Sequence, residues 1–347
     1  MKKRLMALLL SGVLAVSMFA GCSSEIDKTA VVATNGTTDI TLGVANFAAR
    51  LTQAQYDDFY VSYFGENVWR TDMYGYGTTT ADDMKATVLE NLYAMYALKD
   101  HMADYGVEIT LEEFEDINAV ASEFLGSNSI EAIEALGADQ ESVATYLELL
   151  TIQSRMYNEI IKDTDTNVSD EEAATSAYSQ VYISKTSYTD EEGNSVKYTE
   201  EELAGLAQNV KAFAESAKVN GLEAAADAYG YKVTTATYNK DSSVVAEVET
   251  ALKALTTDGA VSDLIELENA YYVVQMDAVV DADATEATRE SIISNRQSEL
   301  YTKVVEDYVA ESEWKLDKKL WEKVTFDNLF TLYEPETETE VLEATEE

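Results

Sequence analysis

The chain has 347 residues, with 24 Lys and Arg against 65 Asp and Glu, and a net charge of −41. It holds one His, one Cys and one Pro, which excludes a zinc centre built from Cys and His and a disulfide framework within the chain. Nucleic-acid binding is disfavoured because phosphate contacts need clustered Lys and Arg. We therefore expect no cofactor, no metal and no nucleic-acid partner.

The N-terminus has the pattern of a secretory signal that ends at the only cysteine. Residues 1–21 begin with three basic residues after the initial Met and continue with an apolar stretch that is short for a spanning helix. The stretch ends in Phe19-Ala20-Gly21-Cys22, which resembles a bacterial lipobox, where the cysteine becomes the first mature residue and carries lipid. We predict export and lipidation at Cys22, with anchoring to the outer face of the bacterial cell membrane. The alternative is an ordinary signal with a chance cysteine.

The next block is predicted to be mainly helical after a short hairpin. Two β-prone runs in residues 31–41 flank Asn35-Gly36, which is the strongest short signal for a hairpin. Apolar spacing and capping residues then predict helices over residues 43–70, 80–105, 110–126 and 139–162. We expect Thr80 to open the second of these helices. His101 lies near its end and is interpreted as a surface residue near a helix C-terminus rather than a general base.

Aromatic residues are dense at the end of the first predicted helix, and two interpretations remain open. One is a surface that binds unfolded chains, since aromatic rings give adaptable contact area. The other is core packing, which the helical spacing favours for most of them. The candidates for client binding are Tyr56, Phe59, Tyr60, Tyr63, Phe64 and Trp69.

Residues 163–171 are predicted to be a linker followed by a helix that Ser169 caps. Acidic and Asn residues alternate there as in a calcium loop, but Val168 and Ala174 occupy the positions that should be Gly and Glu. Residues 170–280 then change to a mixed α+β pattern. The expected order is a strand at 180–184, helices at 199–219 and 221–229, a strand at 231–238, a helix at 243–255, and strands at 261–267 and 271–276.

A long helical region is predicted over residues 285–324, and we expect it to pack back onto the first helical block, because neither block alone looks closed. Residues 334–347 carry seven Glu and no Lys or Arg, so an acidic disordered tail is expected. The lone Pro335 lies in this tail.

The arrangement resembles the extracytoplasmic PrsA/SurA-like foldases over residues 28–325. Residues 31–47 are similar to the family's entry motif, 167–178 to the helix leading into its parvulin-type peptidyl-prolyl isomerase module, and 261–276 to the module's last two strands. The resemblance implies an α+β protein with a helical chaperone domain built from residues 31–165 and 285–325. It also implies a tether at 22–30, an inserted parvulin-like module at 170–280, and unfolded or newly secreted proteins as partners.

The chain departs from the family where catalysis is expected. By resemblance, Gln180 stands about where the first strand usually carries a His, and Tyr272 replaces the second His of the last strand. The resemblance therefore implies weak or lost isomerase activity. Prolyl isomerisation breaks no covalent bond, so an apolar grip on the proline ring could retain some of it. The pocket candidates are Gln180, Tyr182, Phe213, Tyr272 and Met276.

We therefore predict a membrane-anchored extracytoplasmic chaperone, related to parvulin-type peptidyl-prolyl cis-trans isomerases. One alternative is a solute-binding lipoprotein, which predicts alternating strands and helices in two similar lobes. Another is a surface interaction lipoprotein without foldase activity.

Overall fold

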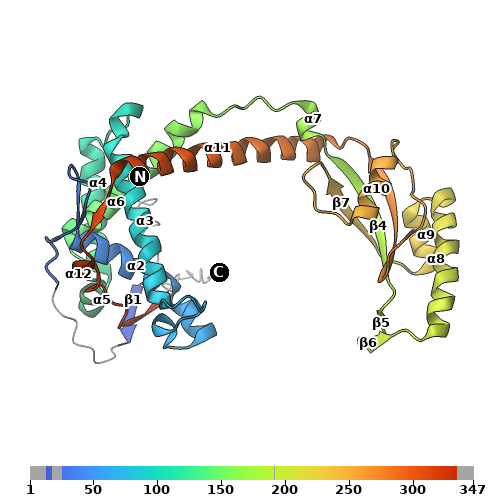
Figure 1. The fold of residues 1–347 in the computed structure, drawn as a ribbon, viewed down its shortest axis with the longest axis horizontal. Helices are drawn as coiled ribbons and strands as arrows, with labels where there is room; N and C mark the ends of the chain where they lie inside the picture. Colours follow the sequence, from blue (N-terminus) through green and yellow to red (C-terminus); the bar gives the residue numbers. More distant parts are fainter. Residues whose placement is uncertain (1–12, 18–25, 191, 334–347) are drawn as a thin grey trace, which may run out of the picture. The chain divides into compact units, whose positions relative to one another are not determined.

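The computed structural model describes residues 13–17, 26–190 and 192–333, and the chain divides into two compact units (Figure 1). Unit 1 comprises Met1–Asp163 and Ser298–Glu347, and unit 2 comprises Thr164–Gln297. Both helices and sheets are present, which confirms the predicted α+β class. Cys22, most of the predicted signal and the acidic tail lie outside the described residues.

Unit 1 is a set of packed helices with two small antiparallel sheets. One sheet has the order β10-β2-β3 and the other pairs β1 with β11. The helices are α2 (Leu42–Phe64), α3 (Thr80–Asp100), α4 (Leu111–Ser127), α5 (Ile130–Leu136), α6 (Gln140–Ile160) and α12 (Lys318–Trp321), with 3-10 turns η1 (Val68–Arg70), η2 (Met102–Tyr105) and η3 (Ile161–Asp163). The strands are β1 (Val13–Ser17), β2 (Val31–Thr34), β3 (Asp39–Thr41), β10 (Lys315–Leu316) and β11 (Leu329–Tyr333).

The predicted hairpin is confirmed in β2 and β3. Asn35 Oδ1 accepts hydrogen bonds from the backbone N–H groups of Thr37 and Thr38, at 2.9 and 2.7 Å. Gly36 adopts φ 89°, a left-handed conformation that glycine tolerates best. The helix after it begins with Thr41 as N-cap. Helix α3 begins at Thr80, as predicted, and its N-cap is Thr79, which shares a capping box with Asp82.

The C-terminal segment completes the core of unit 1. Trp321, Val324 and Phe326 are buried in the same apolar cluster as β2, α2 and α3. Strand β10 pairs with β2, joining Leu316 to Ala33. Helix α11 (Ala282–Ser312) contributes its last part to a second cluster, where side chains such as Val304 pack against α3 and α6. The C-terminal part of the late helical region therefore packs onto the first helical block, as expected.

The prediction of one helical region over residues 285–324 is wrong in its second part. Helix α11 ends at Ser312, and Glu313 has φ 46°, a left-handed backbone that does not continue a helix. The short elements β10 and α12 follow. Strand β11 was not predicted, although Leu329 to Tyr333 is β-prone.

Unit 2 is built on a four-stranded antiparallel sheet with the order β7-β4-β9-β8. Helices α8 and α9 cover one face and α10 covers the other. Between β4 and α8, where no element was predicted, β5 and β6 form a small hairpin. The elements are α7 (Asp170–Ala173), β4 (Ser176–Ser184), β5 (Ser187–Thr189), β6 (Ser195–Lys197), α8 (Glu200–Asn220), α9 (Leu222–Tyr229), β7 (Val233–Tyr238), α10 (Ala246–Ala254), β8 (Ile265–Glu266) and β9 (Ala270–Ala278).

The short helix α7 begins at the predicted cap, where Ser169 Oγ accepts a hydrogen bond from the backbone N–H of Glu172. The predicted strand over residues 261–267 is shorter than expected. Only Ile265–Glu266 forms a strand, and Val261 makes an isolated bridge to Gln275. Among the described helices, none has the length and apolar character needed to cross a membrane.

Candidate functional site

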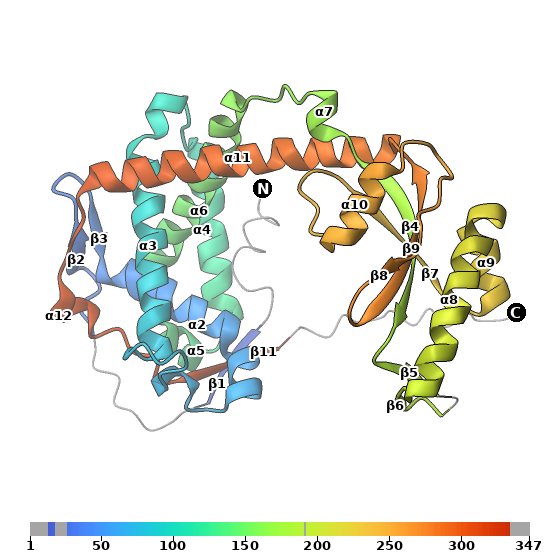
Figure 2. The ribbon, with the colours of Figure 1, turned by 45° about the vertical axis from the view of Figure 1, so that its right-hand side comes forward.

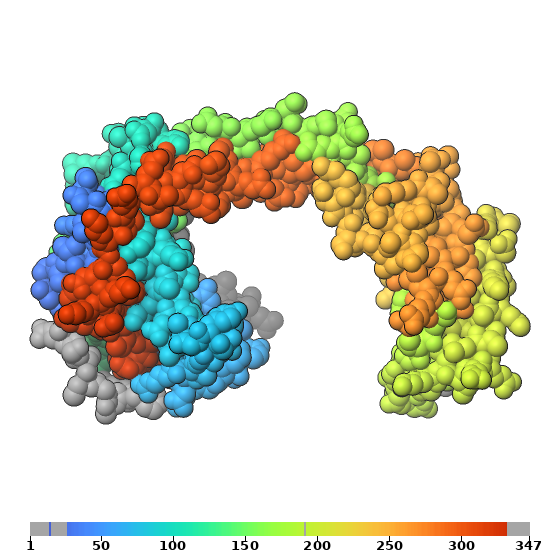
Figure 3. Space-filling view, viewed as in Figure 1, coloured from blue at the N-terminus to red at the C-terminus, as the bar shows by residue number. Residues whose placement is uncertain are grey.

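Four aromatic side chains near the C-terminal end of α2 are exposed to solvent. Tyr56, Phe59, Tyr63 and Phe64, which we call the exposed aromatic group, are 45%, 55%, 72% and 54% exposed. The packing interpretation is therefore wrong for three of the residues whose helical spacing favoured it, because only Tyr60 turns inward. Neighbouring rings are in contact range, with the Phe59 and Tyr63 centroids 4.9 Å apart. Figure 3 shows the end of α2 and the segment after it, in light blue, at the surface of unit 1.

Tyr60 and Trp69 connect this surface to the core. The Tyr60 ring is half-buried and lies 5.2 Å from the Trp69 ring. The Trp69 ring is buried and meets Phe326 of the C-terminal segment edge-on at 5.1 Å. Burial and neighbouring tyrosines raise the pKa of Tyr60, so its hydroxyl stays protonated. Of the six client-binding candidates, Trp69 is thus a core residue, and the other five form one continuous aromatic layer.

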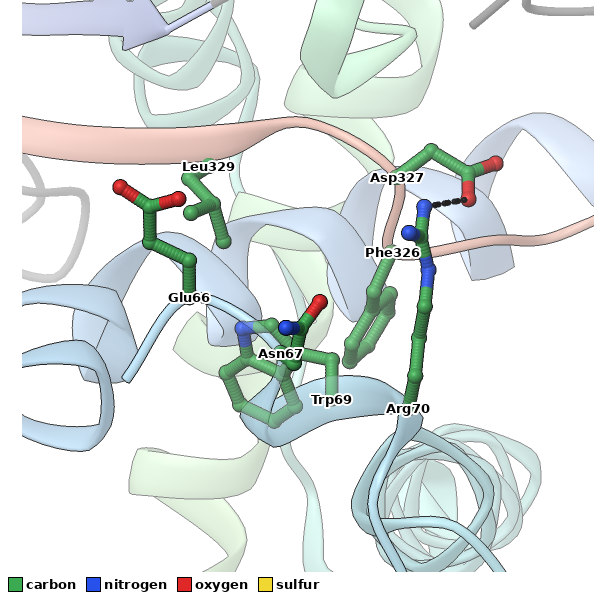
Figure 4. A pocket seen from close by; sticks show the side chains of 7 residues that line it. All are labelled: Glu66, Asn67, Trp69, Arg70, Phe326, Asp327 and Leu329. Atoms are coloured by element: carbon green, nitrogen blue, oxygen red, sulfur yellow. Dashed lines mark hydrogen bonds and ion pairs between the residues drawn. The ribbon is translucent and has the colours of Figure 1, made fainter. Parts of the chain in front are cut away.

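A pocket of about 140 Å³ opens beside Trp69 (Figure 4). The segment after α2 supplies one wall, and the C-terminal segment supplies the other. Arg70 and Asp327 face each other across it in an ion pair of 3.1 Å. Its volume suits one side chain, since sites for small metabolites have volumes of roughly 300–1,000 Å³. The lining residues are Glu66, Asn67, Trp69, Arg70, Phe326, Asp327 and Leu329.

Asp57 is fully buried and holds the C-terminal segment to α2. Its carboxylate accepts hydrogen bonds from Trp69 Nε1 at 2.5 Å, the Phe330 backbone N–H at 2.7 Å and Gln53 Nε2 at 3.2 Å. Burial raises its pKa to about 6, against the opposing effect of these donors. No local pattern singles out Asp57 from its neighbour Asp58 among the 65 acidic residues.

Arg50 lies on α2 about two helical turns before Asp57, and it also binds the C-terminal segment. Its guanidinium donates to the carbonyl oxygens of Ala135 and Thr325, at 3.0 and 2.6 Å, and to Gln53 Oε1 at 2.7 Å. Burial lowers its pKa to about 10, while Asp57 and Asp327 act in the opposite direction. The network of Arg50, Gln53 and Asp57 therefore fixes residues 325–330 against α2.

In unit 2, the sheet separates the five parvulin-pocket candidates. Tyr182 pairs with Tyr272 across β4 and β9, and Gln180 pairs with Val274. Because side chains alternate along a strand, Gln180, Tyr182, Tyr272 and Met276 share the face that α10 partly covers. Phe213 is fully buried on the opposite face, among Val181, Val273 and the α9 side chains. It therefore does not line a pocket with the other four.

On the shared face, Tyr182 and Tyr272 form an edge-to-face pair with centroids 5.2 Å apart. Tyr182 is 54% exposed, so the pair offers an apolar surface with a phenol at its rim. Burial and the proximity of Tyr182 raise the pKa of Tyr272, which keeps it neutral as a hydrogen-bond donor. Of the two positions where the resemblance expects His, Tyr272 belongs to this pair, and Gln180 lies two residues before Tyr182 on the same face of β4.

His101 is packed rather than free on the surface. It is the C-cap of α3, its ring stacks on Tyr308 at 3.8 Å, and its Nδ1 lies 2.9 Å from Asp104. The stack joins α3 to α11, so His101 has a structural role.

No family model matches the chain, and no curated protein matches it. Solved structures that match it include PrsA- and SurA-like foldases. It is similar to the foldase protein PrsA of Lactococcus lactis, with 17% identity, 85% of this chain and 99% of that chain covered, and a TM-score of 0.36. It is also similar to the peptidylprolyl isomerase PrsA of Bacillus cereus, with 14% identity, 86% of this chain and 98% of that chain covered, and a TM-score of 0.31. A structure described among the SurA-like chaperones PEB4 and Cj1289 of Campylobacter jejuni has 12% identity to it, with 83% of this chain and 99% of that chain covered and a TM-score of 0.28.

Proposed function

We propose that the chain is an extracytoplasmic foldase that holds unfolded exported proteins on unit 1. In this proposal Cys22 carries the lipid that anchors the chain, and unit 2 is a parvulin-like module with weak or lost isomerase activity. The observation that carries the proposal is the exposed aromatic group of Tyr56, Phe59, Tyr63 and Phe64.

Large aromatic rings gathered on one surface mark an interaction site more often than scattered single residues do. Exposing apolar area to water has a free-energy cost of roughly 25 cal/mol for each Å², and a client segment that covers these rings removes this cost. Rings are also adaptable contacts, so one surface suits many sequences. The net charge of −41 keeps copies of the chain apart and favours basic segments of clients.

The isomerase part of the proposal concerns the face that carries Tyr182 and Tyr272. Twisting an X–Pro amide has a barrier of roughly 20 kcal/mol and requires no nucleophile or metal. An apolar surface that grips the proline ring lowers this barrier only in part, and the histidines of the family pattern are replaced here. We therefore expect weak or absent catalysis.

A solute-binding lipoprotein is less well supported. That alternative predicts two similar lobes of alternating strands and helices, whereas unit 1 is mainly helical and unit 2 has an antiparallel sheet. An interaction lipoprotein without foldase activity would share the same fold, so only an assay separates it from the proposal.

The assay uses the mature chain, residues 22–347 with Cys22→Ser. Aggregation of a chemically unfolded client is followed by light scattering at increasing ratios of chain to client, and isomerisation of an X–Pro peptide is followed in parallel. The proposal expects suppression of aggregation at near-stoichiometric ratios and little or no acceleration of isomerisation. Absence of suppression, for both acidic and basic clients, would reject the foldase function.

A further inference from the structure

Strand β11 takes its partner strand from the predicted signal segment. Val13–Ser17 pairs antiparallel with Leu329–Tyr333, with Val16 opposite Phe330 and Ser17 opposite Leu329 (Figure 2). Among the described strands, β1 is the one that pairs with β11. Cleavage before Cys22 would remove β1 and leave this edge of β11 without it.

Strand β1 lies on apolar side chains of unit 1 and makes one polar contact along the edge that faces away from β11. We call the site that β1 occupies the groove. Leu14 is 1% exposed and is packed in a cluster formed by α2, α4, α5 and α6. Its backbone N–H donates to Asn128 Oδ1 at 2.9 Å, and Asn128 in turn is held by a bond from its Nδ2 to the Phe124 carbonyl oxygen. The groove thus offers main-chain pairing on one side, a side-chain amide on the other, and an apolar floor.

Side chains of α2 occupy the other edge of the C-terminal segment. The Phe330 N–H is bonded to Asp57, and the Asn328 carbonyl oxygen accepts from Gln53 Nε2 at 2.8 Å. Since backbone groups alternate between the two edges of a strand, these contacts direct the remaining edge of β11 toward β1. A fixed edge beside an apolar floor is the arrangement used in recognition by strand addition.

We propose that in the mature chain this groove binds an extended apolar segment of an unfolded client, antiparallel to β11, with a Leu-sized side chain in the place of Leu14. The inference rests on the proposed function and on removal of residues 1–21. The occupant is indicated by β1 itself, whose backbone pairs with β11 and whose Leu14 side chain is buried in the apolar cluster. Main-chain bonds carry no sequence information, so such a groove accepts many apolar segments.

One residue connects the groove with the rest of the candidate site. Leu329, the first residue of β11, also lines the pocket beside Trp69, so a client segment along β11 ends beside this pocket. The acidic tail after β11 does not match the apolar floor, because seven of its fourteen residues are Glu.

The test is direct binding of a fluorescent peptide with the sequence of residues 11–20, extended by two lysines for solubility. The mature chain, residues 22–347 with Cys22→Ser, is compared with a chain of residues 11–347 that carries the same substitution and keeps β1. We expect the mature chain to bind the peptide at least ten-fold more tightly, because β1 fills the groove in the longer chain. Thermal unfolding of both chains verifies that they are folded.

Two variants then locate the peptide. A peptide with Leu14→Asp should bind at least ten-fold more weakly, since it places a charge in the apolar cluster. Asn128→Ala in the mature chain should weaken binding about five-fold through loss of one hydrogen bond. The exposed Ser127→Ala serves as its matched control and should leave the affinity unchanged.

Equal affinity of the two chains, or no effect of Leu14→Asp, would overturn the inference. So would a gain in affinity on deletion of residues 334–347, which would make the tail the occupant, or dimers of the mature chain that the peptide dissociates, which would make it a second copy. If the mature chain suppresses aggregation but fails to bind the peptide, the groove is rejected and the foldase function stands.

Discussion

The carboxylate of Asp57 accepts a hydrogen bond of 2.7 Å from the backbone N–H of Phe330, 273 residues further along the chain. The same carboxylate accepts from Trp69 Nε1. One buried acid on α2 is therefore bonded both to Trp69, in the segment after α2, and to Phe330 in β11. The placement of the proposed client-binding surface depends on this contact.

The first prediction concerns removal of that acid. Asp57→Ala leaves the buried N–H groups of Trp69 and Phe330 without their acceptor, so we expect a loss of about 2–4 kcal/mol in the free energy of unfolding of unit 1. Urea unfolding followed by tryptophan fluorescence measures it. Glu90→Ala on the exposed side of α3 is the control, with an expected change within about 0.5 kcal/mol. Equal stability of the two variants would contradict the structural role of Asp57.

The second prediction is a dependence of stability on pH. The pKa of Asp57 is raised to about 6 from 3.8, so between about pH 4 and pH 6 the folded chain binds more protons than the unfolded chain at this group. Its contribution to stability is therefore present at low pH and is lost as the pH rises through this window, by about 3 kcal/mol. Asp57→Asn removes the titration. The stability of the unmodified chain relative to this variant should fall from pH 4 to pH 7, and a rise would indicate a lowered pKa instead.

The third prediction separates packing from surface in unit 2. Phe213→Ala should lower the stability of the unit by about 3–5 kcal/mol, because it opens a cavity among fully buried side chains. Tyr182→Ser should change stability little and should abolish any residual acceleration of X–Pro isomerisation. Circular dichroism on heating and a peptide isomerisation assay provide the two readouts. Residual activity that survives Tyr182→Ser would place catalysis elsewhere.

The fourth prediction concerns the exposed aromatic group. Replacing Tyr56, Phe59, Tyr63 and Phe64 together by Ser should reduce the suppression of client aggregation at least five-fold, because the apolar area available to clients is lost. A matched control in the same unit is Leu111→Ser with Phe114→Ser, which are 75% and 53% exposed on α4. The control should retain suppression. An equal loss in both variants would indicate a general apolar effect rather than a defined surface.

Local patterns were sufficient to predict most of the elements. The Asn35-Gly36 hairpin and the Ser169 cap follow from short-range hydrogen bonding, so the sequence alone determines them. The order of elements in unit 2 follows from apolar periodicity in the same way. The α+β class and the packing of the C-terminal segment on unit 1 were also predictable from the order of the predicted elements.

Contacts between distant segments were not predictable. The role of Asp57 depends on Trp69 and Phe330, and no local pattern marks it among 65 acidic residues. Helical spacing placed Tyr63 and Phe64 on a packed stripe, but both side chains are exposed, at 72% and 54%. The spacing likewise gave no indication that Phe213 lies across the sheet from Tyr272.

The most direct test of client binding is site-specific photocrosslinking. A benzophenone amino acid replaces Tyr63, Phe114 or Tyr188, one at a time, in the mature chain, which is then irradiated with a radiolabelled unfolded client. We expect strong crosslinks from position 63 and weak ones from positions 114 and 188, with the signal at 63 lost when the client is folded beforehand. Equal crosslinking from all three positions would contradict the assignment of client binding to the aromatic surface of unit 1.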